Sequence, residues 1–272
     1  MASSSLDQTF AAHARVLAPG PTIVDHTAKP ALFSVISWGC AGTAWLARAL
    51  GSHPDIFCLH AANHYWSSML RQPLADGVDY LNVVVSMGKG FPVIGEVHGV
   101  SRELLPAVRE WYGNRFQAAV LVREPMRRVL SQINLSRELG SVRHWDPAHL
   151  HNIARKAGLD PARQKEAQWV QLHAFEMLNV ICEERQIGPV YRIEDLGTDP
   201  LAMTSLIRHL SGDTLSVNAD WLTHLRAIPP INQHSNHHGL QALDDESRHY
   251  LRRIVTDEAR DHYRSLGYEV DW

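Results

Sequence analysis

The sequence has few cysteines and no strong excess of charge. Its three cysteines, Cys40, Cys58 and Cys182, form no C-x-x-C pair and are odd in number, which excludes the usual metal and disulfide frameworks. We therefore expect a reducing, cytoplasmic setting. A net charge of -3 over 272 residues provides no general attraction to nucleic acid or anionic membranes. The expected partner is a small molecule held by a few local groups.

Long apolar runs, internal repeats and low-complexity tracts are also absent. The opening MASSSLDQ has no basic region followed by an apolar stretch, so we expect no secretion signal. No run approaches the roughly 18 apolar residues of a membrane-spanning helix. The sequence leaves the oligomeric state open, and a homo-oligomer is allowed.

What the sequence does contain is an alternation of short apolar runs with helical segments. Runs at 31–37, 91–97, 118–122 and 189–193 indicate buried strands. Each is followed by a plausible helix, the first at 43–52. The alternation predicts an α/β fold with a central parallel sheet flanked by helices. We expect one domain over residues 31–272, preceded by an N-terminal extension over residues 1–30.

A single long helix is predicted between Asp160 and Glu184. Asp160-Pro161 is a good N-cap and first-turn pair. Apolar and aromatic side chains, among them Trp169 and Ile181, then recur at helical spacing. We interpret this stripe as core rather than as a cofactor site.

The first chemical motif is a glycine turn in the segment SVISWGCAGTAWL, residues 34–46. Gly39 and Gly42 would let backbone N–H groups approach an anion at the start of a helix, with the Thr43 hydroxyl beside them. Taken alone, the turn fits packing as well as phosphate binding. It lacks the lysine of the G-x-x-x-x-G-K-[ST] pattern, which disfavours an ordinary ATP or GTP hydrolase.

This segment, continued by ARALGSHPDIF, resembles the 5′-phosphosulfate loop of sulfotransferases that use 3′-phosphoadenosine 5′-phosphosulfate (PAPS). In that family a strand leads into Lys-Ser-Gly-Thr-Thr-Trp-Leu and a helix. Gly42, Thr43, Trp45 and Leu46 match. The resemblance implies a P-loop-like sulfotransferase fold, with PAP as the nucleotide product and no metal. It implies a cofactor-binding segment made of Gly39, Cys40, Ala41, Gly42, Thr43, Ala44 and Trp45.

The segment departs from the family pattern at two positions. Cys40 stands where the family usually has lysine, and Ala44 stands where it has a second threonine. The family's lysine reaches the bridging oxygen of the leaving phosphosulfate, and a cysteine cannot supply that charge. Lys89, Arg102 and Arg127 are candidates to restore it, and nothing in the sequence selects among them.

The second motif is LVREPMRRVLS, residues 121–131. An arginine, Arg123, follows an apolar strand end, and Ser131 comes eight residues later on a helix. This resembles the family's 3′-phosphate motif, in which both residues bind the terminal phosphate. Arginine offers phosphate a planar fork and serine a short donor. Each residue alone fits a surface role equally well, but the two motifs together, about 80 residues apart in the family's order, favour a nucleotide site.

A third segment, VYRIEDLGTDP at residues 190–200, resembles the family's strand-ending Tyr-Glu-Asp-Leu, with Ile193 at the tyrosine position. We expect it to support architecture. The ending at Leu266-Gly-Tyr268 is also family-like, and the main resemblance covers residues 31–210.

Sulfuryl transfer needs a base for the acceptor, and FPVIGEVHG at residues 91–99 offers two. His98 resembles the family's catalytic histidine, and a neutral imidazole suits proton abstraction. Glu96 is the alternative, since other branches use a glutamate there. Residues 96 and 98 would share one strand face. The alternative that His98 and Glu96 only satisfy hydrogen bonds at a strand end remains open.

The acceptor site is expected near the aromatic and polar cluster of His60, His64, Tyr65 and Trp66. The segment INQHSNHHG, residues 231–239, sits where the family carries a loop over the nucleotide. Its histidines at 234, 237 and 238 could suggest a metal, but no Cys or carboxylate pattern supports one. The resemblance implies that Trp45 stacks on adenine; a tryptophan on a helix can also simply pack in the core.

Two further functional hypotheses stay open beside the sulfotransferase. A binding protein of the same fold with little catalysis would account for Cys40. An unusual P-loop kinase is less favoured, because the required lysine is absent. The identity of the acceptor is not encoded in any short motif.

Overall fold

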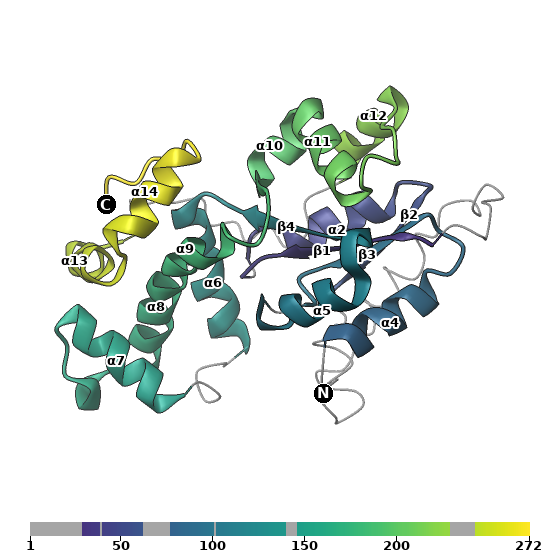
Figure 1. Cartoon of the computed structure of the whole chain (residues 1–272). Helices are drawn as coiled ribbons and strands as arrows, with labels where there is room; N and C mark the ends of the chain where they lie inside the picture. Colours follow the sequence, from purple (N-terminus) through teal and green to yellow (C-terminus); the bar gives the residue numbers. More distant parts are fainter. Residues whose placement is uncertain (1–28, 39, 62–76, 101, 140–145, 229–242) are drawn as a thin grey trace. The chain divides into compact units, whose positions relative to one another are not determined.

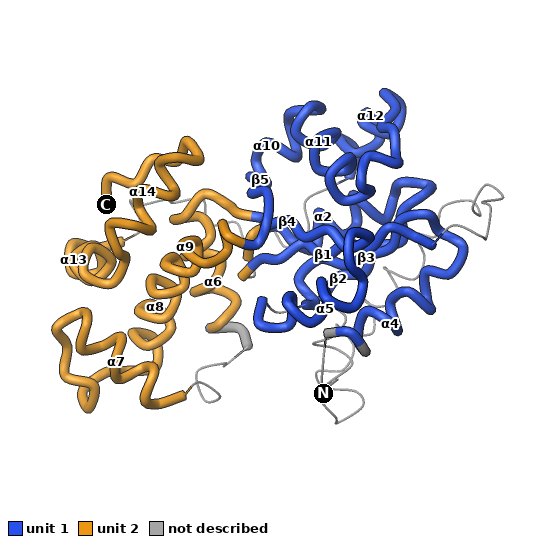
Figure 2. Tube along the Cα trace, viewed as in Figure 1, with its two compact units in different colours: residues 1–37, 42–121, 187–231 blue, residues 38–41, 122–186, 232–272 orange. Residues whose placement is uncertain are grey.

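The computed structural model describes residues 29–38, 40–61, 77–100, 102–139, 146–228 and 243–272. It divides into two compact units (Figure 2). Unit 1 comprises residues 1–37, 42–121 and 187–231, and unit 2 comprises residues 38–41, 122–186 and 232–272. The chain therefore passes into unit 2 for four residues of the glycine turn and then returns to unit 1.

Unit 1 is built on a five-stranded sheet in the order β2-β3-β1-β4-β5. The pairings β1–β3, β1–β4 and β2–β3 are all parallel. The central parallel sheet flanked by helices confirms the predicted α/β class. The strands are β1 (Ala31–Ile36), β2 (Ile56–His60), β3 (Val93–Val97), β4 (Phe116–Val122) and β5 (Val190–Arg192).

Helices cover both faces of this sheet (Figure 1). Helix α4 (Gly77–Met87) and helix α5 (Leu105–Tyr112) pack on the face that carries Leu32 and Ile36. Helix α2 (Thr43–Gly51) contacts β2 and β3, and helix α11 (Pro200–Leu210) contacts β1. Because alternate strand residues face opposite sides, the near-continuous apolar runs are what a sheet covered on both faces requires.

The remaining elements of unit 1 are short connections and two helices. Helix α10 (Ile193–Thr198) follows β5 directly and leads into α11, and helix α12 (Ala219–Ala227) contacts α10. The 3₁₀ turns η1 (Arg102–Leu104) and η2 (Gly113–Arg115) flank α5.

Unit 2 is helical over its described residues. Helix α8 (Glu166–Glu176) contacts α6 (Pro125–Leu139), α7 (Pro147–Ala157) and α13 (Asp245–Ile254). Helix α14 (Asp257–Ser265) packs on α9 (Ile181–Glu184). The side chains of Phe175, Leu178, Ile181 and Leu251 are fully buried, so this unit has an apolar core of its own.

The structure differs from the sequence expectations at two points. It contains strand β2, which the apolar pattern does not predict, because IFCLH is short and most of its residues are only half-buried. The single helix over residues 160–184 is wrong. Asp160 caps only the 3₁₀ turn η4 (Pro161–Arg163), and α8 is separated from α9 by the 3₁₀ turn η5 (Met177–Val180). Within η5, the Asn179 amide donates to the Ile254 carbonyl at 3.0 Å and accepts from Thr256 N at 2.9 Å, bonds that tie this turn to the α13–α14 connection.

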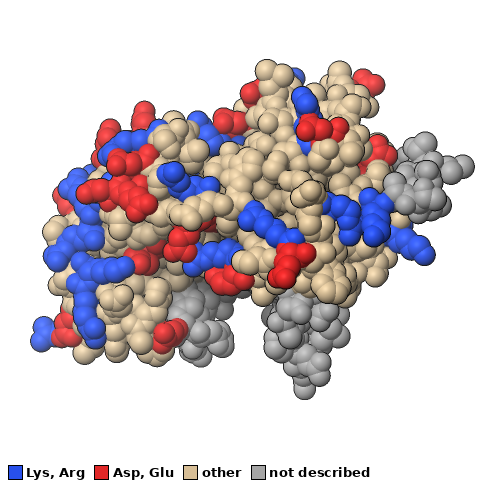
Figure 3. Space-filling view, viewed as in Figure 1, with Lys and Arg blue, Asp and Glu red and all other residues tan. Residues whose placement is uncertain are grey.

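On the face in Figure 3, basic and acidic side chains lie interspersed, in keeping with the small net charge of -3. Among the helices that the structure describes, none is long and apolar enough to cross a membrane.

Candidate active site

Three residues with left-handed backbone follow the ends of three neighbouring strands. Cys40 (φ 54°) comes after β1, Ala61 (φ 47°) directly after β2 and His98 (φ 68°) directly after β3. Positive φ is costly for residues with a Cβ atom and concentrates at functional sites. Open parallel sheets bind ligands at the carboxyl ends of their strands. The residues with positive φ therefore follow the ends of strands, where the sequence motifs also predict the ligand site.

In unit 1, the glycine turn ends at Gly42, the N-cap residue of α2, with φ 83°. A Cβ atom at this position would lie 2.8 Å from Cγ1 of Ile193, so glycine is required there by both conformation and space. Ile193, at the family's tyrosine position, thus packs on the turn. Thr43 begins the helix, and its Oγ1 is hydrogen-bonded to His60 Nε2 at 3.0 Å.

His98 is held by the backbone of unit 1. Its Nδ1 lies 2.5 Å from the carbonyl oxygen of Ser37. A carbonyl only accepts, so Nδ1 carries the proton, and the lone pair of the neutral ring is on Nε2. The ring stacks against His60 with centroids 6.4 Å apart. In this tautomer Nε2 is the ring nitrogen that can take a proton.

Glu96 is fully buried in β3. Its Oε1 accepts hydrogen bonds from the Ser34 hydroxyl and from Val100 N, and Ser34 is its register partner on β1. Burial raises the pKa of Glu96 to about 7, against the lowering effect of these hydrogen bonds. The strand ends at Val97 and His98 has positive φ, so the strand alternation that would place residues 96 and 98 on one face does not reach His98.

In unit 2, the two nucleotide motifs meet. Arg123, immediately after β4, donates from Nη1 to the carbonyl oxygen of Cys40 at 3.0 Å. The hydroxyl of Ser131 on α6 lies beside the Cys40 thiol and lowers its pKa. Gln132, the next residue, accepts a hydrogen bond from Cys40 Sγ at 3.4 Å. A hydrogen bond thus joins the turn at Cys40 to Arg123, which lies 83 residues later in the sequence.

Sequence reasoning missed Arg128. This arginine is only 4% exposed. It donates to the carbonyl oxygen of Trp38 at 3.4 Å and to the Tyr263 hydroxyl at 3.4 Å. Arg128, Ser131 and Gln132 occupy positions i, i+3 and i+4 of α6 and therefore share one helix face. The spacing did not single out Arg128, because Arg127 lies four residues before Ser131 and meets the same criterion.

The other candidate cations are placed differently. Lys89 and Arg127 are exposed, and Arg102 pairs with Glu103 at 2.8 Å. Burial raises the pKa of the Cys40 thiol, while the nearby Ser131 hydroxyl and the charges of Arg128 and Arg123 lower it. Cys40 therefore lies beside two guanidinium groups.

Trp45 is half-buried, and its indole N–H donates to the carbonyl oxygen of Ile228 at 3.3 Å. Ala41 is fully buried and Ala44 half-buried. Several predicted residues lie outside the described part of the chain. They are Gly39, His64, Tyr65, Trp66 and the loop at 231–239, together with residues 1–28 of the expected extension.

Comparisons with known proteins return structures and no sequence relatives. No family model matches the chain, and no curated protein matches its sequence. A sulfotransferase from Alicyclobacillus acidocaldarius is 17% identical with a TM-score of 0.41, covering 74% of this chain and 92% of that one. A mouse sulfotransferase in complex with PAP is 14% identical with a TM-score of 0.39, and the match covers 94% of this chain and 86% of that one. A Streptococcus pneumoniae PezAT toxin-antitoxin structure is 13% identical with a TM-score of 0.31, and the match covers 83% of this chain and 98% of that one.

Proposed function

We propose that the chain is a PAPS-dependent sulfotransferase that transfers a sulfuryl group to a hydroxyl or amine of a small organic acceptor and releases PAP. The observation that carries this proposal is the meeting of the two nucleotide motifs in unit 2. Arg123 donates to the carbonyl oxygen of Cys40, and the Ser131 hydroxyl lies beside the Cys40 thiol. An arginine fork, a serine hydroxyl and a second, buried arginine on one turn form a set of donors suited to phosphate.

In this proposal Arg128 takes over the charge that Cys40 does not supply. Its guanidinium is buried and fixed by the carbonyl oxygen of Trp38 and the hydroxyl of Tyr263. A cation held before the reaction begins needs no reorganisation as negative charge develops on the leaving phosphate.

His98 is the proposed general base. Its Nδ1–H is directed at the Ser37 carbonyl, so Nε2 could accept the proton of the acceptor hydroxyl or amine. The acceptor oxygen or nitrogen would then bond to sulfur as the bond from sulfur to the phosphate oxygen breaks, which releases PAP. Glu96 is fully buried, and its Oε1 already accepts hydrogen bonds from Ser34 and Val100. We therefore assign Glu96 to positioning the end of β3.

A turnover assay tests the proposal. Purified protein is incubated with PAPS and panels of phenols, alcohols and amines, and PAP and sulfated products are quantified. PAP formation that depends on an acceptor is expected. Binding of PAP without turnover on any acceptor would favour the second function, a nucleotide-binding protein with little catalysis.

The substitution Cys40→Lys separates these two functions further. If the protein were inactive because it lacks the loop lysine, the Cys40→Lys substitution would create activity. We expect the opposite, because the new ammonium would lie close to Arg123 and Arg128, where like charges repel. The variant should lose stability and gain no turnover. ATP competition against PAP tests the kinase alternative, since a kinase would prefer ATP.

A further inference from the structure

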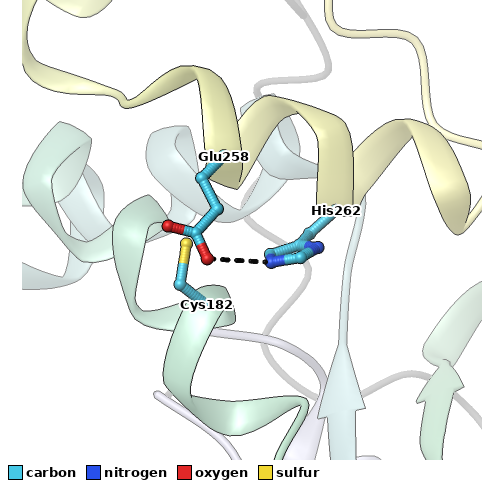
Figure 4. Close-up of side chains that lie close together, drawn as sticks. All are labelled: Cys182, Glu258 and His262. Atoms are coloured by element: carbon cyan, nitrogen blue, oxygen red, sulfur yellow. Dashed lines mark ion pairs between the residues drawn. The ribbon is translucent and has the colours of Figure 1, made fainter.

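Helices α9 and α14 of unit 2 bring together a thiol, a carboxylate and an imidazole. Cys182 Sγ, a carboxylate oxygen of Glu258 and a ring nitrogen of His262 all lie within 4.8 Å of one another. Figure 4 shows Glu258 and His262 on successive turns of one helix, with Cys182 reaching toward them from the other. Residues 258 and 262 are at i and i+4, which places both on one face of α14.

The donor set matches one class of metal ion. A thiolate sulfur, an imidazole nitrogen and a carboxylate oxygen are the three ligand types that zinc takes, commonly three from the protein and a fourth position for water. Calcium and magnesium take oxygen ligands instead. Cys182 and His262 are half-buried and Glu258 is exposed, so an ion can enter from solvent.

We propose that Cys182, Glu258 and His262 form a zinc site that links α9 to α14. Zinc binds Sγ as the Cys182 thiol releases its proton to solvent, and the fourth ligand is water. The sequence expectation of no metal considered the cysteine spacing and one histidine-rich segment. Those criteria cannot detect ligands that come together only when two helices pack. The site does not depend on the proposed sulfotransferase activity.

Arg185 competes with the metal in this arrangement. Its Nη1 lies 2.6 Å from Nδ1 and 3.1 Å from Nε2 of His262, and Nε2 also lies 3.5 Å from Glu258 Oε1. Arginine only donates, so a ring nitrogen that it bonds must be the acceptor. Coordination of a metal through Nε2 uses the lone pair of that nitrogen and leaves the ring proton on Nδ1, so Arg185 must then turn away. Arg185 is exposed, so it can do so.

Cobalt titration of the full-length protein tests the site. Co²⁺ substitutes for Zn²⁺, and a thiolate ligand gives a sulfur-to-cobalt charge-transfer band in the near ultraviolet. We expect one equivalent of cobalt to produce this band and Zn²⁺ to displace it. Absence of the band would overturn the proposal, including the case in which cobalt binds only to histidines elsewhere in the chain.

Three variants assign the band to this cluster. Cys182→Ser should abolish it, and His262→Gln should weaken cobalt binding at least tenfold. Cys40→Ser is the matched thiol control, and His249→Gln, an exposed histidine on the neighbouring α13, is the imidazole control; both should leave the band unchanged. A band that survives Cys182→Ser, or is lost in Cys40→Ser, would refute the assignment.

Arg185→Gln provides a test that loss of folding cannot imitate. A glutamine carbonyl can accept the Nδ1 proton that the metal-bound tautomer presents, as partners of metal-bound histidines usually do. This variant should bind Zn²⁺ about tenfold more tightly than the wild type. Weaker or unchanged binding would contradict the proposed geometry at His262.

Discussion

The two units carry different chemistry. In unit 1 the groups at the strand ends are Thr43, His60, Glu96 and His98, none of which carries a fixed positive charge. In unit 2 the turn at Cys40 is bonded by Arg123 and lies beside the buried Arg128. Proton transfer and anion recognition are thus assigned to different stretches of chain. The proposed function therefore predicts that turnover and nucleotide affinity can be lost separately.

The largest separation is expected at His98. Asparagine tolerates the left-handed conformation of this position (φ 68°), so His98→Asn removes the base with little backbone strain. Turnover should fall by about 10²–10⁴-fold, with PAP affinity unchanged. Kinetics and calorimetry on the same preparation measure both. His249→Gln, which removes an exposed histidine of α13, is the control, and equal turnover in the two variants would exclude His98 as base.

Arg128 is the converse test. Arg128→Met removes the buried guanidinium, and we expect PAP to bind about 10–100-fold more weakly, since charge-assisted hydrogen bonds contribute about 1.5–3 kcal/mol. Stability should fall as well, because the carbonyl oxygen of Trp38 and the Tyr263 hydroxyl lose a donor.

The neighbouring Arg127→Met is a matched control for Arg128→Met. It removes the same charge from an exposed position of the same helix and should leave PAP affinity unchanged. Similar weakening in both variants would mean that general charge, rather than the buried guanidinium, attracts the nucleotide.

These residues also show what the sequence could predict. The strand ends and the glycine turn could be predicted from the sequence, because apolar runs that stop at glycine or arginine mark where a strand ends and a helix follows. Burial was not readable: Arg127 and Arg128 are identical in type and adjacent, and only packing distinguishes the exposed one from the buried one. For the same reason Asn179 gave no sign that it would interrupt a helix through contacts some 75 residues away. The boundary between an extension at 1–30 and a domain at 31–272 stays a prediction.

Glu96 makes stability depend on pH. Its pKa is raised from 4.5 to about 7 in the folded protein, so the folded state holds the proton more tightly than the unfolded state. Its contribution is fully present below the unfolded pKa of 4.5 and is lost as pH rises through about 7.

Relative to Glu96→Gln, the wild type should therefore lose up to about 3 kcal/mol of unfolding free energy between pH 4.5 and 8. Denaturant titrations of both proteins across this range measure the difference. Parallel pH profiles would contradict the raised pKa.

Cys40→Ser should have the smallest effect. The thiol is neutral between its partners, and a serine hydroxyl can also donate to the Gln132 side chain. We expect PAP affinity and turnover to change less than about threefold, a difference below 1 kcal/mol. A large loss of turnover would show that the thiol itself takes part in catalysis.

The central claim is that the turn joining Cys40, Arg123 and Ser131 binds the phosphates of PAP. Calorimetric titration of the wild type and of Arg123→Ala with PAP, and then with ATP, tests it most directly. We predict tight PAP binding and weak ATP binding by the wild type, and PAP binding weakened at least tenfold in the variant. Equal PAP affinity in the two proteins, or no PAP binding at all, would contradict the account.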